Sequence, residues 1–157
     1  MPEESEKQRL DRELNELLQE LRVALPGVQV LFAFLLTVAF SQRFPQLTTI
    51  QRNVYFATFL ATAVTSVMFI APTAYHRIRW REYDKEQMLV TSTHLTLAGT
   101  IFLALSITGT VFLITDVMFG LGAAGLSAGV IAGLLAWFWF GLPLVRKLGE
   151  GDARRGR

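Results

Sequence analysis

Cysteine is absent from this chain of 157 residues, and charged residues are scarce. Without a thiol, the chain has no disulfide bond, no cysteine nucleophile and no cysteine-ligated metal centre. Charged residues make up 18% of the sequence, against roughly 25% in a typical soluble domain. Four stretches contain no Asp, Glu, Lys or Arg: residues 23–42, 53–75, 87–115 and 117–145. A soluble core does not use so many long uncharged stretches, so the sequence predicts an integral membrane protein.

Hydrophobic residues fill these stretches; they make up 52% of the chain, and the mean hydropathy is +0.38. A helix needs about 20 residues to cross about 30 Å of hydrocarbon. The apolar runs are continuous, whereas barrel strands alternate between apolar and polar residues. Backbone groups in lipid must also bond within their own segment, which favours helices. We therefore predict an all-α polytopic membrane protein with transmembrane helices near residues 23–42, 53–75, 94–117 and 119–145.

Basic residues divide unequally between the two sides of these spans. Of the 15 Lys and Arg, all but Arg43 and Arg52 lie before the first span, between the second and third, or after the fourth. Cytoplasmic loops carry the excess of Lys and Arg in membrane proteins. We therefore predict a multi-pass protein of the bacterial inner membrane with both termini cytoplasmic. Because the basic residues flank apolar segments, we expect them to meet lipid headgroups and not nucleic acid.

The first 22 residues carry seven acidic and four basic residues and have no apolar centre, so we do not expect them to be a cleaved signal peptide. They predict a separate cytoplasmic amphipathic helix, which Pro26 and Gly27 either break or join to the first span. Its apolar face consists of Leu10, Leu14, Leu17 and Leu21. That face can dock on the protein itself, on the membrane surface or on a second copy. The predicted domains are residues 1–22, a four-helix domain 23–145 and a flexible basic tail 146–157.

Strongly polar groups are rare within the spans. Gln29 can hydrogen-bond to another helix or serve as an ion ligand, and a hydrogen bond is the simpler interpretation. Asp116 is the acid nearest the outer end of a span, and its natural partners are Arg43 and Arg52. These three residues predict either an exposed ion pair or an entry site for a cation or proton. The hydroxyls of the second span, such as Thr62, can bond locally to carbonyls of their own helix.

The loop between the second and third spans combines histidine, arginine and aromatic residues. His76 and His94 lie at its two ends and are either ordinary interfacial residues or a pH-sensitive pair. The two histidines have no third ligand that would complete a metal site. The loop itself is a candidate contact for anionic lipid headgroups, through Arg77, Arg79, Trp80 and Arg81.

Small residues give the clearest signal for helix packing. Gly125, Gly129 and Gly133 form two successive GxxxG steps on one face of the fourth span. Ala57 and Ala61 form a weaker groove in the second span. Such faces let two helix backbones approach closely. This approach serves either packing within one chain or the formation of an oligomer.

Several segments also resemble a known family. They are ELNELLQELRVALPGVQVLFAFLLTVAFSQRF, QRNVYFAT, APTAYHR and DKEQMLV, within roughly residues 10–120. These segments are similar to a family of small, uncharacterised actinobacterial membrane proteins, some of which carry the automatic label sodium:proton antiporter. The resemblance implies a four-helix integral membrane protein and supplies no catalytic residues.

No motif for a phosphate cradle, a serine nucleophile or a paired-carboxylate site occurs in the sequence, so we expect a protein that is not an enzyme and needs no cofactor or metal. The small-residue faces predict an interaction or accessory subunit. We expect its partners to be membrane lipids and either further copies of the chain or another membrane protein. The alternative is a small proton-coupled cation transporter, as the family label implies.

Overall fold

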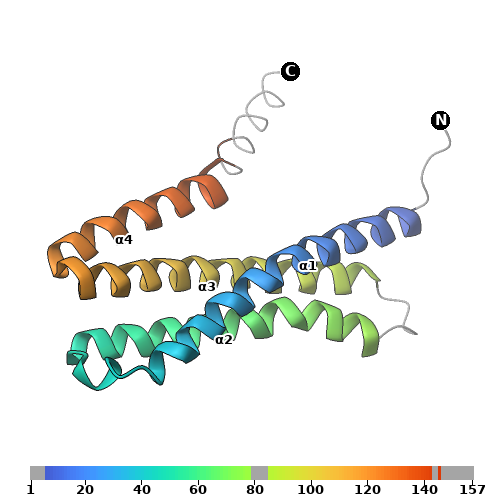
Figure 1. The fold of residues 1–157 in the computed structure, drawn as a ribbon. Helices are drawn as coiled ribbons and strands as arrows, with labels where there is room; N and C mark the ends of the chain where they lie inside the picture. The colour runs from blue at the N-terminus through green and yellow to red at the C-terminus, as the bar shows by residue number, and fades with distance from the viewer. Residues whose placement is uncertain (1–5, 79–84, 143–144, 146–157) are drawn as a thin grey trace. The chain divides into compact units, whose positions relative to one another are not determined.

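The computed structural model describes residues 6–78, 85–142 and 145, and these residues are helical apart from short connections (Figure 1). The three longest helices are α1 (Glu6–Ala39), α2 (Thr49–Ile78) and α3 (Lys85–Phe119). A 3-10 helix, η1 (Phe44–Gln46), connects α1 to α2. After α3, helix α4 (Leu121–Leu135) continues into a π-helix, η2 (Ala136–Gly141). The part of the chain that the structure describes contains no strand, and the all-α prediction is confirmed for it.

The chain forms two compact units, Met1–Ser106 and Ile107–Arg157. The first unit contains α1, η1, α2 and the first part of α3. The second contains the rest of α3 together with α4 and η2. Helix α3 passes from one unit into the other without a break.

Four helical segments are long and apolar enough to cross a membrane: Gln8–Ala39, Thr49–Ala74, Glu86–Phe119 and Leu121–Gly141. Helix α1 has 34 residues and is therefore about 51 Å long at 1.5 Å per residue. Since the hydrocarbon core of a bilayer is about 30 Å thick, α1 is longer than a single crossing requires. Each of the four predicted spans thus falls in a helical segment that is long and apolar enough to cross a membrane, and the first and third fall in helices longer than one crossing requires.

The prediction of a separate N-terminal amphipathic helix is wrong, because α1 runs without interruption through Pro26 and is itself an apolar helix. The packing face explains this continuity. Buried side chains recur every seven residues on both sides of the proline, at Leu14, Leu21, Val28 and Leu35, each 5% exposed or less. A proline inside a helix removes one backbone hydrogen bond, whereas the side chains of this face make dispersion contacts with their neighbours on both sides of the proline. Packing of this continuous face therefore outweighs the cost of the proline.

The same spacing organises the other helices of the first unit. Residues Tyr55, Thr62 and Phe69 of α2 are buried at seven-residue intervals, and so are Ser92, Gly99 and Ser106 of α3. Buried faces that repeat every seven residues are typical of helices that cross at a small angle. The three helices meet in one hydrophobic cluster. It consists of Leu21, Val28 and Phe69, with Leu17, Ala24, Leu25 and Leu103 packed against it.

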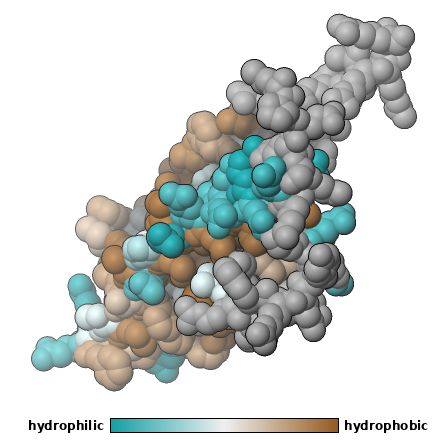
Figure 2. Space-filling model, turned by 90° about the vertical axis from the view of Figure 1, so that its right-hand side faces the viewer, coloured by the Kyte–Doolittle hydropathy of each residue, from teal (hydrophilic) through white to brown (hydrophobic). Residues whose placement is uncertain are grey.

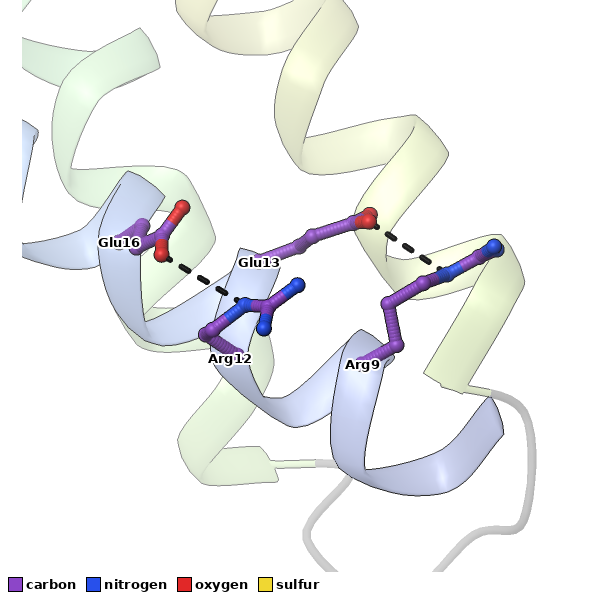
Figure 3. Close-up of polar contacts among 4 residues, drawn as sticks. All are labelled: Arg9, Arg12, Glu13 and Glu16. Atoms are coloured by element: carbon purple, nitrogen blue, oxygen red, sulfur yellow. Dashed lines mark ion pairs between the residues drawn. The ribbon is translucent and has the colours of Figure 1, made fainter. Parts of the chain in front are cut away.

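Charged side chains lie on the first turns of α1, beside this packed face. Arg9 Nε lies 3.5 Å from Glu13 Oε1, and Arg12 Nε lies 3.8 Å from Glu16 Oε1 (Figure 3). Both pairs are substantially exposed, and exposed pairs of this spacing contribute only about 0.3–0.5 kcal/mol. Figure 2 shows hydrophilic side chains gathered on one face of the molecule, next to hydrophobic ones. The exposed ion pairs therefore contribute little to the position of α1, which depends on the buried leucines, Leu14 and Leu21.

In the second unit, a single residue connects α3 to α4. Gly120 has a φ of +86°, a conformation that residues with a side chain rarely adopt. Its N–H donates to Asp116 O at 3.0 Å, and its carbonyl accepts from Ala124 N at 3.1 Å. Ser127 Oγ then donates to Thr115 Oγ1 of α3 at 3.1 Å. The tight link therefore brings α4 back against the last turns of α3.

Candidate functional site

The interior of the first unit contains hydroxyl groups and no described charge. The buried hydroxyl residues besides Tyr55 are Thr58, Thr62 and Thr65 of α2 and Ser92 and Ser106 of α3, each 4% exposed or less. Among the residues that the structure describes, no carboxylate or basic side chain is buried. The arrangement therefore offers hydrogen bonds between neutral groups.

Most of these hydroxyls bond to their own helix, as the sequence predicted for the second span. Thr62 Oγ1 donates to Thr58 O at 2.8 Å, and Thr65 Oγ1 donates to Ala61 O at 2.9 Å. On α3, Ser106 Oγ donates to Phe102 O at 2.8 Å. These bonds satisfy the hydroxyls within an apolar interior, so the residues that make them are structural.

Helices α2 and α3 are in close contact at Gly99. A Cβ atom at this position would lie 2.6 Å from Phe69 Cε1 and 3.2 Å from Met68 Cβ. Thr65 Oγ1 also lies 3.4 Å from Gly99 O, so a second contact crosses the same place. Sequence reasoning missed Gly99 as a packing residue. The available signal was the run of small residues Ser92, Thr96 and Gly99, spaced four and three apart.

An aromatic cluster ties the end of α1 to the start of α2. The hydroxyl of Tyr55 donates to Leu35 O at 2.8 Å, and both residues are buried. The Tyr55 ring lies 5.1 Å from Phe44 in an edge-on arrangement and 6.3 Å from Phe59 in a stacked one, measured between ring centroids. Sequence reasoning also missed this cluster, because the bond joins residues that are 20 positions apart.

Three candidate polar residues of the first unit lie on its surface. Gln29 is exposed on α1, next to the buried Val28, and so does not line the interior. Arg43 and Arg52 are exposed near η1 and at the start of α2. Asp116 belongs to the second unit, where it is half-buried. Pairing of Asp116 with either arginine therefore stays a prediction.

The histidines give no metal site in the described structure. His94 is exposed, and its Nδ1 lies 2.8 Å from Val90 O on the same helix. Since a carbonyl only accepts, Nδ1 carries the proton in this contact. The side chain of His76 lies outside the described residues. Within the described ranges, no group of three or more potential ligands that could hold a metal ion occurs.

The predicted lipid-headgroup residues also lie outside the described part. For Arg77 this concerns the side chain, and for Arg79, Trp80 and Arg81 the whole residue. The tail, residues 146–157, is not described either. The contact with anionic lipid therefore stays a prediction.

The small-residue faces of α2 and α4 differ in what they contact. On α2, Ala61 is 9% exposed and part of the packed interior, whereas Ala57 is exposed. On α4, the residues that pack within the second unit are alanines, with Ala124 and Ala128 at 0% and 8% exposed. The glycine face of α4, defined as Gly125, Gly129 and Gly133, is exposed, and no described atom lies within 4 Å of a Cβ built at any of the three.

Large hydrophobic side chains lie on the surfaces of both units, among them Phe40 at 87% and Leu126 at 73% exposed. Together with four apolar helices of spanning length, they indicate a polytopic α-helical protein embedded in a membrane. The chain matches the model of a family of unknown function, DUF6328, over residues 3–143, and it belongs to that family. The resemblance to an uncharacterised family is thereby confirmed. No curated protein and no solved structure matches the chain.

Proposed function

We propose that this chain is a nonenzymatic integral membrane protein that acts as an interaction or accessory subunit and forms a homo-oligomer through the glycine face of α4. The observation that carries this proposal is the open space at Gly125, Gly129 and Gly133. The alanines of α4 already supply its packing within the second unit. The glycine face is therefore left for another helix.

The physics of helix association in lipid supports this assignment. Apolar surface alone does not drive two helices together in a membrane, because lipid tails are as apolar as leucine. Close approach of the two backbones does drive association, because it increases the dispersion contact between the helices. Successive residues in a helix are about 100° apart around its axis, so Gly125 and Gly129 lie beside, and not on, the face of Ala124 and Ala128. One face of α4 can thus pack within the chain while the other meets a partner.

A substitution of Gly129 tests the proposal. Leucine at this position makes α4 more apolar, so membrane insertion should be retained, but its side chain holds a partner helix away. Crosslinking in membranes should show that Gly129→Leu reduces dimers and higher species at least several-fold while the melting temperature of the protein stays the same. The control is Ala123→Leu, which enlarges an exposed residue on another side of α4 and should leave crosslinking at the wild-type level.

Two results would contradict the oligomer proposal. Wild-type crosslinking and stability in Gly129→Leu would show that the glycine face contacts lipid. A lower melting temperature without a selective loss of crosslinked species would show that the face packs within one chain.

The second candidate is a small proton-coupled cation transporter. Exchange of a proton for a cation needs an ionisable group at membrane depth, and Asp116 is the residue of the spans best placed for it. The half-buried position of Asp116 in α3 is the observation that supports the transporter as a second candidate. Flux of sodium and protons into proteoliposomes tests it, and a pH-gradient response that Asp116→Asn abolishes would place the transporter first.

A further inference from the structure

Many serine and threonine side chains in these helices share one bonding pattern, and two buried ones do not follow it. Seven hydroxyls donate to the carbonyl four residues earlier on the same helix: those of Thr37, Thr62, Thr65, Ser66, Thr93, Thr100 and Ser106. Ser92 Oγ and Thr96 Oγ1 are buried and have no hydrogen-bond partner among the described residues. Burying a hydroxyl without a partner is unfavourable. Since these two residues are four apart, both hydroxyls lie on one face of α3.

Helix α2, which contacts α3 at Gly99, contains a proline. Pro72 lies within α2 and is less than 2% exposed. Because proline has no N–H, it cannot donate to the carbonyl of Met68, four residues earlier. The carbonyl of Met68 therefore lacks its regular α-helical donor.

The register of α2 and α3 predicts that Pro72 lies at about the level of Ser92, and Met68 at about the level of Thr96, one turn away. Thr65 Oγ1 contacts Gly99 O at 3.4 Å, and the two helices run in opposite directions (Figure 1). Two turns further along α2 from Thr65 is Pro72, and two turns back along α3 from Gly99 is Ser92. Met68 lies one turn beyond Thr65, as Thr96 lies one turn before Gly99, and its Cβ would be 3.2 Å from a Cβ on Gly99.

We propose that a water molecule binds between α2 and α3 at this level. It donates one hydrogen bond to Met68 O and one to a hydroxyl oxygen of the pair, and it accepts a hydrogen bond from the other hydroxyl. Three bonds are the usual number for a buried water. The three protein groups are neutral oxygens, which suit water, whereas hard cations such as Ca²⁺ take six or more oxygen ligands.

This water takes the place of the N–H that Pro72 lacks. Backbone carbonyls in a membrane need a partner, and ordered waters and hydroxyl side chains supply it at helix prolines. The site explains why Ser92 and Thr96 do not bond to their own helix as the seven hydroxyls named above do. It is independent of the proposed oligomer, because it lies within the first unit.

A double-mutant cycle tests the site. In Pro72→Ala, the new N–H can bond to Met68 O, so the water loses one partner. Ser92→Ala should then lower the melting temperature by about 2–4 °C in the wild-type background and by about 1 °C or less together with Pro72→Ala. The matched control is Ser106→Ala, on the same helix and equally buried but bonded to Phe102 O; its effect should be the same in both backgrounds.

Two outcomes would overturn the proposal. An equal loss from Ser92→Ala in both backgrounds would show that no water couples the two helices. A higher melting temperature for Ser92→Ala would show that its hydroxyl is unpartnered, because removal of such a group is favourable. Nuclear Overhauser cross-peaks from water to the Ser92 and Thr96 side chains provide a second measurement: the site predicts long-lived ones, and their absence from the folded wild-type protein would also contradict it.

Discussion

Replacement of Gly99 by leucine should force α2 and α3 apart. Even a Cβ atom would lie 2.6 Å from the ring of Phe69, which is itself 2% exposed and held in the hydrophobic cluster. Overpacking of this kind costs about 1–3 kcal/mol, and we expect the upper part of that range because a leucine adds three carbons beyond Cβ. Thermal and denaturant unfolding in detergent measure the loss.

A glycine in open space provides the control for this substitution. Gly27 lies inside α1 with no described atom within 4 Å of a Cβ at that position. Gly27→Leu should leave stability unchanged or raise it by up to about 1 kcal/mol, since glycine is a poor helix former. Equal stability of Gly99→Leu and Gly27→Leu would contradict the close contact between α2 and α3.

Truncation of Leu21 should have an effect of similar or larger size. Leu21 is 2% exposed and contacts the cluster that contains Val28 and Phe69. Leucine-to-alanine changes in a core cost about 2–5 kcal/mol, so Leu21→Ala should lower the free energy of unfolding by about 3 kcal/mol. Hydrogen exchange across the first turns of α1 should rise at the same time.

Val23, two residues later on the same helix, is the matched control because it is 78% exposed. Val23→Ala should change stability by about 0.5 kcal/mol or less. If Leu21→Ala were tolerated as well as Val23→Ala, the first turns of α1 would not be packed against α2. The N-terminal part of α1 would then not contribute to packing within the first unit.

The helical class and the four spans follow from the sequence, because long uncharged runs have few other structures open to them in lipid. The boundaries of the helices, in contrast, do not follow from the distribution of charged residues. We ended the first predicted element at Arg22, where the charges end, but the buried face continues from Leu14 and Leu21 to Val28. The seven-residue spacing of that face, and not the distribution of charge, predicts how far α1 extends.

The contacts between helices could be predicted less well. Periodicity shows which residues share a face, but it does not show which two faces meet or in what register. The contact of Gly99 with Phe69 depends on that register, and so does the position of Ser92 relative to Pro72. Gln29 lies one position away from the buried Val28 and is exposed, so its hydrogen bond to another helix stays a prediction.

On α4, the sequence identified the small residues but not their division of roles. Neighbouring alanine–glycine pairs recur every four residues along this helix, and either the alanines or the glycines could allow close packing. The structure shows that Ala124 and Ala128 are the buried ones. That distinction depends on the turn at Gly120, which sets the rotation of α4 relative to the end of α3.

The sequence predicts that the chain crosses the membrane four times with both termini on the cytoplasmic side, and this prediction underlies the rest of the account. Its motivation is the position of 13 of the 15 Lys and Arg residues on one side of the spans. Reporter enzymes fused after residue 48, after residue 85 and after residue 157 measure the topology directly. The account predicts an external reporter at 48 and cytoplasmic reporters at 85 and 157, and an external reporter at 85 would contradict it.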